Sequence, residues 1–269
     1  MPVWISEMDG PGHHNGRSER CAIAIMAKAP GAGRIKTRLS PLLSPQEANA
    51  LGCCFLRDMT ASLALAAETA PIDPYVAFAP AGSEAAFDGL VEPGTGFVLA
   101  DGSMPAPPGI AGFGTCLFQA ACVLFAKGYG AVGLLNSDSP SLPTARLIEA
   151  ARLLASPGEC VVLGPAADGG YYLIGMKAPH ADIFRDIDWS TQRVAEQTRS
   201  RAADLGIALV ELAPWYDVDD AASLRQLLQD LQGAARTGDA AYAAPATAGF
   251  LEANGIADRV AARLADAGM

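Results

Sequence analysis

Residues 21–39 read CAIAIMAKAPGAGRIKTRL, and this stretch decides the fold class. Residues 21–27 form a short apolar run, as expected of a strand buried on both faces of a parallel sheet. The loop that follows holds four of the chain's 19 Lys and Arg residues within positions 28–38. Small residues let backbone N–H groups approach an anion, and cations neutralise it. The stretch therefore predicts a strand that ends in an anion-binding loop, although a solvated basic turn would give the same composition.

Further apolar runs alternate with segments of helical length. We expect strands at residues 74–79, 96–100, 131–135, 160–163, 171–174 and 207–212, and helices at 44–67, 115–127, 144–155, 191–205 and 221–231. This alternation predicts a Rossmann-like α/β fold in three α/β/α layers, with a mostly parallel sheet covered on both faces. We divide the chain into a disordered leader at 1–20, a nucleotide-binding domain at 21–231 and an Ala-rich helical appendage at 232–269.

Composition narrows the classes of partner. The net charge of −10 argues against nucleic acid, because a phosphate backbone demands a basic face. Six cysteines form no CxxC pair, which favours reduced thiols, and the start of the sequence lacks a secretory signal. No apolar run of about 18 residues is uninterrupted, which argues against a membrane span. These features predict a cytoplasmic protein that binds neither nucleic acid nor membrane.

The cationic loop fits neither of two common phosphate-binding motifs. A Walker A loop needs Gly directly before Lys-Thr, and Ile35 stands there. The GxGxxG pattern is incomplete, since Lys36 takes the place of the third glycine. Any phosphate cradle formed by Gly31, Gly33 and the neighbouring cations must therefore be of another kind.

Carboxylates follow several of the expected strands. Asp138 follows the expected strand at 131–135 after Asn136-Ser137, and it would either hold Mg²⁺ or Mn²⁺ or cap a turn before Pro140. Asp168 lies in an Asp-Gly-Gly tight turn, and it would serve that turn, orient a hydroxyl or join Asp138 at a metal. Asp217 and Asp219 alternate on an expected strand end, where they repel each other unless a cation or water lies between them.

Three further side chains bear on the type of catalysis that the protein could perform. Trp189 would stack on a base or sugar, while Ser190 would cap the next helix. His180 is the one histidine outside the leader, which disfavours a Ser-His-Asp triad and means that a metal must be held by oxygen. Cations with scattered carboxylates favour metal-assisted attack on a phosphate or a nucleotide-linked sugar, in which charge and position replace covalent catalysis.

Five motifs, in this order, resemble the DUF2064 family, also called rSAM/selenodomain-associated transferase 1 or CofC-like glycosyltransferases, within the GT-A nucleotide-diphospho-sugar transferase superfamily. The similarity spans roughly residues 21–231. The family patterns are AK-x-P-x-x-G-x-x-KTRL at 27–39, with Gly33 in the glycine place, D-x-P-x-L at 138–142, G-P-x-x-DGGYYL-x-G at 164–175, W-x-T at 189–191 and D-x-D at 217–219.

The resemblance implies a GT-A fold with a mixed, mostly parallel sheet. It also implies that Lys28, Lys36 and Arg38 contact nucleotide phosphates, and that Asp138 and Asp219 bind the metal. With Asp168 as a further catalytic candidate, the expected activity is a Mg²⁺- or Mn²⁺-dependent transfer from a nucleotide or nucleotide-sugar donor to a small-molecule acceptor. Both nucleotidyl and glycosyl transfer remain open.

Two segments depart from the family pattern. Residues 111–117 read AGFGTCL where the family usually carries an Asp-Leu-Gly-x-Arg-like segment, and Asn136-Ser137 stands where Gly-Thr is usual. The first change removes both charges and is expected to alter contacts to the substrate or the base. It also supports the alternative of a non-catalytic nucleotide-binding or regulatory protein that retains the fold.

Overall fold

Strand β1 (Cys21–Lys28) lies inside a mixed sheet. The computed structural model describes residues 16–31, 36–39, 42–233 and 240–266, and within these ranges seven strands form one sheet in the order β3-β2-β1-β4-β6-β5-β7. The other strands are β2 (Ile72–Ala79), β3 (Gly96–Leu99), β4 (Ala131–Leu135), β5 (Cys160–Pro165), β6 (Tyr171–Met176) and β7 (Ala208–Glu211). The helices are α1 (Pro45–Ala67), α2 (Phe113–Ala126), α3 (Thr144–Ala155), α4 (Val194–Asp204), α5 (Ala221–Gly233), α6 (Pro245–Ala253) and α7 (Ile256–Asp266). Short 3-10 turns are η1 (Arg17–Glu19), η2 (Thr37–Leu39), η3 (Glu84–Phe87) and η4 (Ala181–Phe184).

Six of these strands run in the same direction. Strand β6 pairs antiparallel with both β4 and β5, whereas the other strand pairs are parallel. The prediction of a Rossmann-like α/β fold with a mixed, mostly parallel sheet is confirmed. The antiparallel strand arises because the Asp-Gly-Gly turn returns the chain directly from β5 to β6, and a parallel return would need a crossover of a dozen or more residues.

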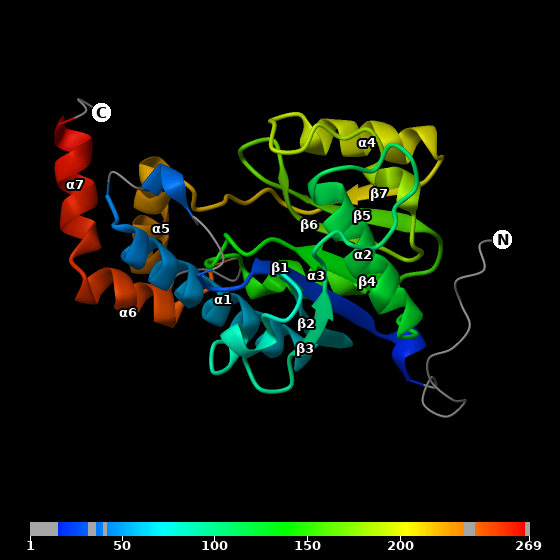
Figure 1. Cartoon of the computed structure of the whole chain (residues 1–269), viewed down its shortest axis with the longest axis horizontal. Coiled ribbons are helices and arrows are strands. Elements are labelled where there is room, and N and C mark those ends of the chain that lie inside the picture. The colour runs from blue at the N-terminus through cyan, green and yellow to red at the C-terminus, as the bar shows by residue number, and fades with distance from the viewer. Residues whose placement is uncertain (1–15, 32–35, 40–41, 234–239, 267–269) are drawn as a thin grey trace.

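Helices cover both faces of the sheet, which gives three layers (Figure 1). Helices α1 and α3 bury Leu63 and Leu147 against one face, in a core shared with Ile23 of β1. Helix α2 buries Leu117 on the other face, together with η4 and α4. Because successive side chains of a strand point to opposite faces, the continuous apolar run of β1 supplies both cores.

A third core joins α1 to the C-terminal helices. It contains Leu39, Phe55, Val218, Leu227 and Leu251, which come from five separate parts of the chain. Figure 1 shows α5, α6 and α7 gathered on one side of the molecule beside α1. These helices lie in and next to the segment that we expected to be an Ala-rich helical appendage.

Helix α1 begins as its sequence predicts. Ser44 accepts a hydrogen bond from the Glu47 amide, the Glu47 carboxylate accepts from the Ser44 amide, and Pro45 takes the first helical position. Among the described helices, α1 is the one that is long and apolar enough to cross a membrane. Its apolar side chains pack in two of the cores, and it buries Asp58, whose carboxylate accepts from the amides of Ala246 and Thr247 at 2.9 and 2.7 Å.

The topology brings the predicted loops to one edge of the sheet. Strands β1, β4, β5 and β7 run in the same direction, so the loops after them leave from the same edge, and the turn before β6 lies there too. Ligands of open α/β sheets bind at this carboxyl edge.

Two local predictions were wrong. Ser190 does not cap α4, which begins at Val194, because Ser190 has a φ of +64° and the chain turns through Thr191 before the helix. Asp217 and Asp219 do not alternate on a strand, because β7 ends at Glu211. Pro214 follows shortly after and has no N–H with which to extend the ladder.

Candidate functional site

Lys36 lies at the centre of the carboxyl edge. Its ammonium donates to Asp138 Oδ1 at 2.7 Å and to the Val218 carbonyl oxygen at 2.8 Å, and it lies 3.6 Å from Asp219 Oδ1. The Lys36 side chain is 2% exposed and also sits over the Phe55 ring, 4.8 Å from its centroid. The structure thus directs Lys36 to carboxylates, whereas the sequence predicted contact with phosphate. Two aspartates converge on the ammonium, and their negative charge compensates the free-energy cost of burying it.

Asp138 and Asp219 converge on one cation position. Their side chains are 38% and 39% exposed, so both also face solvent. The pKa of Asp219 is raised, first by burial and then by the neighbouring Asp138 charge, while Lys36 and Arg38 oppose the rise. The sequence prediction that these two carboxylates lie together therefore matches the geometry.

The donor set suits a hard divalent cation. Mg²⁺ is usually held by one or two carboxylates together with substrate phosphates and water, and Asp138 and Asp219 supply that number of oxygen ligands. Across the described ranges, no group of three or more His, Cys, Asp or Glu side chains is arranged to enclose a metal by itself. A metal at this position would thus depend on ligands from the substrate.

Asp217 is a site residue that the predicted set omitted. It accepts hydrogen bonds from Asn136 Nδ2 at 2.6 Å and from Ser139 Oγ at 2.9 Å. Burial raises its pKa to about 7, and the charge of Asp138 adds to the rise. The Asp-x-Asp spacing pointed to this carboxylate, but its partner Asn136 stands where the family usually has Gly. The departure at position 136 thus provides a donor to Asp217.

Arg38 and Asp168 also belong to this cluster. Arg38 is exposed, and its charge lowers the pKa of Asp219. Asp168 accepts from the Gly170 amide at 2.8 Å, as in a tight turn, and its charge raises the pKa of both Asp217 and Asp219. Asp168 therefore serves the tight turn, and the same turn places its carboxylate beside the other aspartates, while a role in orienting a hydroxyl or holding a metal stays a prediction.

The rest of the cationic loop is described only in part, and its contacts with nucleotide stay a prediction. Gly31 has a φ of +79°, and its N–H donates to Asn49 Oδ1 at 2.9 Å, so that group is already used within the protein. Gly33 lies outside the described residues. Lys28 is exposed at the end of β1 and lies near Cys116 of α2, whose pKa is raised first by burial, while the charge of Lys28 opposes the rise.

Trp189 lies in an aromatic cluster at the start of α2. Its ring meets Phe113 and Tyr171 edge to face, with centroids 5.9 and 6.4 Å away. A Cβ at Gly114 would come within 2.8 Å of the indole nitrogen, so glycine there admits the indole. The Phe113 side chain is 47% exposed and presents its ring to solvent. Stacking was predicted for Trp189, but Phe113, in the segment that departs from the family pattern, is the more accessible ring.

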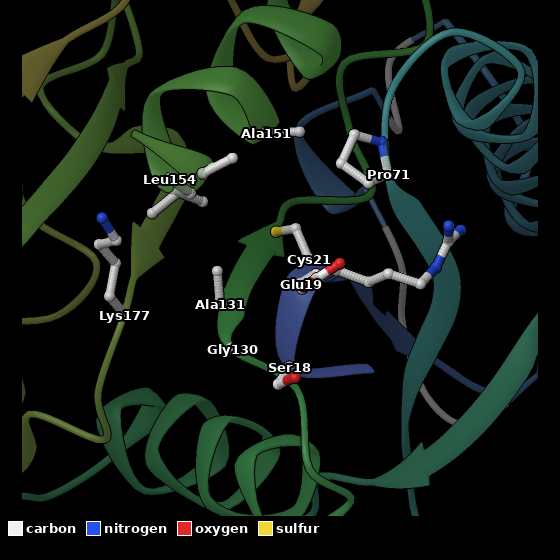
Figure 2. Close-up of a pocket in the computed structure, with 11 residues that line it drawn as sticks. Ser18, Glu19, Cys21, Pro71, Gly130, Ala131, Ala151, Leu154 and Lys177 are labelled. Carbon is white, nitrogen blue, oxygen red and sulfur yellow. The ribbon is translucent and has the colours of Figure 1, made fainter. Parts of the chain in front are cut away.

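A cavity of about 300 Å³ lies away from these residues. It is lined by the first residues of β1 and β4, Cys21 and Ala131, and therefore lies at the amino edge of the sheet. Figure 2 shows Cys21 between Pro71 on one side and Leu154 and Lys177 on the other. Burial raises the pKa of the Cys21 thiol to about 12, which makes it a poor nucleophile. The candidate active site is therefore the open carboxyl edge.

Part of this edge lies in a stretch of sequence that matches a known family. The model of the DUF2064 family, described as uncharacterized proteins conserved in bacteria, matches residues 60–191, which include Asp138, Asp168 and Trp189. This stretch of the chain is therefore similar to the DUF2064 family. No curated protein matches the sequence.

Solved structures extend the similarity beyond residues 60–191. A candidate nucleotide-diphospho-sugar transferase from Desulfovibrio desulfuricans G20 is 25% identical, with a TM-score of 0.71 over 89% of this chain and 97% of that one. A cytidylyltransferase from Leptospira borgpetersenii serovar Hardjo-bovis is 11% identical, with a TM-score of 0.47 over 88% and 96% of the two chains. The second similarity is too distant to inform function. The first shows that the nucleotide-diphospho-sugar transferase fold extends over most of this chain.

Proposed function

We propose that this protein is a divalent-cation-dependent transferase that uses a nucleotide or nucleotide-sugar donor and a small-molecule acceptor. The observation that carries the proposal is the convergence of Lys36, Asp138 and Asp219 at the carboxyl edge, with Arg38 and Asp168 beside them. The similarity to the candidate nucleotide-diphospho-sugar transferase supports the same class of donor.

The roles follow from charge and position. Asp138 and Asp219 would hold Mg²⁺ or Mn²⁺, which, when bound, would neutralise phosphate oxygens and stabilise the departing diphosphate. Arg38 is an exposed guanidinium suited to pair with a phosphate. Asp168 would orient an acceptor hydroxyl, and the exposed Phe113 ring would contact an apolar or ring-shaped part of a substrate. Lys28 would add a second positive charge along the donor.

Two chemistries fit this arrangement. In nucleotidyl transfer, an acceptor phosphate or phosphonate oxygen attacks the α-phosphate of a nucleoside triphosphate, and pyrophosphate leaves. In glycosyl transfer, an acceptor hydroxyl attacks the anomeric carbon of a nucleotide sugar, and a nucleoside diphosphate leaves. We favour no base, sugar or acceptor, because residues 111–117 differ from the family pattern.

Donor class can be tested directly. A thermal-shift screen of nucleoside triphosphates and nucleotide sugars, with and without Mg²⁺ or Mn²⁺, would identify the donor, because a ligand stabilises the folded state in proportion to its saturation. Mixing the donor with candidate acceptors and measuring pyrophosphate and nucleoside diphosphate separately then distinguishes the chemistries. Absence of any metal-dependent shift across both donor classes would contradict the proposal.

Two observations favour a second function, that of a non-catalytic nucleotide-binding protein. Lys36 already pairs with the two carboxylates, and the usual charged segment is replaced around Phe113. This alternative predicts nucleotide binding without turnover. Metal-dependent product formation that is lost in Asp138→Ala, with nucleotide binding retained, would exclude it.

A further inference from the structure

Lys36 occupies the place between the two aspartates where a divalent cation would bind. Its ammonium has Asp138 and Asp219 at 2.7 and 3.6 Å and the Val218 carbonyl oxygen at 2.8 Å. Oxygen atoms lie around this ammonium as they would around a bound metal ion, and only 2% of the Lys36 side chain is exposed. The Lys36 ammonium therefore takes the place of a bound cation.

The backbone also holds Lys36 in this position. Lys36 has a φ of +52°, a left-handed conformation that is uncommon for a residue with a side chain. The Leu39 amide donates to the Lys36 carbonyl oxygen at 2.9 Å, which closes the turn η2, and Leu39 is fully buried. Backbone strain of this kind persists where surrounding contacts fix the conformation, and it is frequent at functional sites.

Charge makes the ammonium and a divalent cation mutually exclusive here. Two positive groups within about 4 Å repel strongly in a partly buried site, and the same carboxylate oxygens cannot be fully used by both. Without Lys36 or another cation, Asp138 and Asp219 would repel each other, since a carboxylate oxygen of each lies within 3.6 Å of the same ammonium.

We propose that Lys36 is a tethered cation that must leave Asp138 and Asp219 before a divalent cation can bind between them. The inference rests on the proposed function, because it takes these carboxylates as the metal ligands. It makes metal binding alone unfavourable, since the displaced ammonium has no anionic partner. A donor that brings phosphate oxygens with the metal gives Lys36 a new partner, so metal and nucleotide should each strengthen the binding of the other.

The first test measures Mn²⁺ binding in the absence of nucleotide, by electron paramagnetic resonance of free Mn²⁺, in the wild type, Lys36→Met and Arg38→Met. Removing the ammonium should tighten Mn²⁺ binding at least 10-fold. Arg38→Met removes a nearby exposed charge but leaves the Lys36 ammonium between Asp138 and Asp219. It should change Mn²⁺ binding less than 3-fold. Far-ultraviolet circular dichroism checks that each variant is folded.

Each outcome has one meaning. Equal or weaker Mn²⁺ binding in Lys36→Met, in a folded variant, overturns the tethered-cation proposal and leaves the proposed transferase standing. An equal gain in both variants also overturns it, because general charge repulsion would then be sufficient. Failure of both the wild type and Lys36→Met to bind Mn²⁺, with or without the donor, contradicts metal dependence itself.

A second test uses the wild-type protein alone. Reductive methylation with formaldehyde and cyanoborohydride, followed by peptide mass spectrometry, reports which lysine amines are accessible. Lys36 should be protected in chelator and become labelled when Mn²⁺ alone is added at a concentration that saturates the site, because the displaced ammonium then has no phosphate partner, whereas exposed Lys28 should be labelled in both conditions. Unchanged protection of Lys36 while Mn²⁺ is bound would overturn the proposal.

Discussion

The backbone of Asp138 is tied directly to that of Val218. The Asp138 carbonyl oxygen accepts a hydrogen bond from the Val218 amide at 2.8 Å, and the Val218 carbonyl oxygen accepts in turn from Lys36. The loop after β4 and the loop before α5 are therefore joined without the use of a carboxylate. The backbone of Asp138 should therefore keep its position when its carboxylate is removed.

Asp138→Ala should consequently abolish turnover without unfolding the site. We expect product formation to fall by about 100-fold or more, which is the usual loss when one preorganised charge at a reaction centre is removed. Nucleotide binding measured without metal should be retained within several-fold, because Arg38 and Lys28 remain. Steady-state kinetics and calorimetry measure the two effects. Asp204→Asn, at a carboxylate that is 71% exposed on α4, is the control and should alter neither.

Lys36→Ala should weaken nucleotide binding when Mg²⁺ is saturating. Under that condition the ammonium is expected to bond to phosphate, and a hydrogen bond to a charged group contributes about 1.5–3 kcal/mol, or roughly 10- to 150-fold in Kd. Isothermal titration of wild type and variant measures the change. Lys127→Ala, at the opposite end of α2, is the control. An unchanged Kd in Lys36→Ala would exclude the phosphate contact.

The sequence could predict the fold because its determining signals are local. The apolar run of β1 and the capping residues of α1 are each complete within about ten residues, and both elements form where expected. The contacts of single polar groups are not local. Asn136 donates to Asp217 across 81 residues, and the Gly31 amide is taken by Asn49 across 18. Whether a polar group in a loop faces a ligand or another loop depends on these pairings.

Lys36 illustrates the same limit. A lysine in a small-residue loop favours contact with an anion, and that expectation is correct in kind. The anions in the structure are Asp138 and Asp219, which the fold brings from distant parts of the chain. Composition around Lys36 contains no information on Phe55 or Val218, yet these residues decide how deeply the ammonium is buried.

Gly169→Ala should disturb the turn that carries Asp168, and Gly170→Ala is its matched control. Gly169 has a φ of +89°, and a Cβ there would lie 2.1 Å from the Gln192 carbonyl oxygen, which is backbone and cannot turn aside. At Gly170 the nearest atom is Asp168 Oδ1 at 3.1 Å, on a side chain that can move. We expect a loss of about 2 kcal/mol or more for Gly169→Ala, with reduced turnover, and less than about 1 kcal/mol for Gly170→Ala. Urea unfolding and steady-state kinetics measure the two effects. Equal losses in the two variants would mean that the clash with Gln192 is unimportant.

Acid should loosen the C-terminal helices through Glu47. Arg259 of α7 donates to the Glu47 carboxylate at 2.7 Å and to the Leu42 carbonyl oxygen at 3.0 Å, so it joins α7 to the start of α1. Hydrogen bonding from Arg259, with that from Ser44, lowers the pKa of Glu47 to about 2. Because the folded-state pKa lies below the unfolded value, the stabilisation from this carboxylate is fully present above about pH 4.5 and is lost as the pH falls through about 2.

Thermal unfolding between pH 6 and 2.5 should therefore show a steeper fall in Tm for the wild type than for Glu47→Gln. Glu252→Gln, at an exposed carboxylate on α6, should keep the wild-type slope. Equal slopes in the wild type and Glu47→Gln would mean that Arg259 holds α7 through the Leu42 carbonyl oxygen and that the charge on Glu47 contributes nothing.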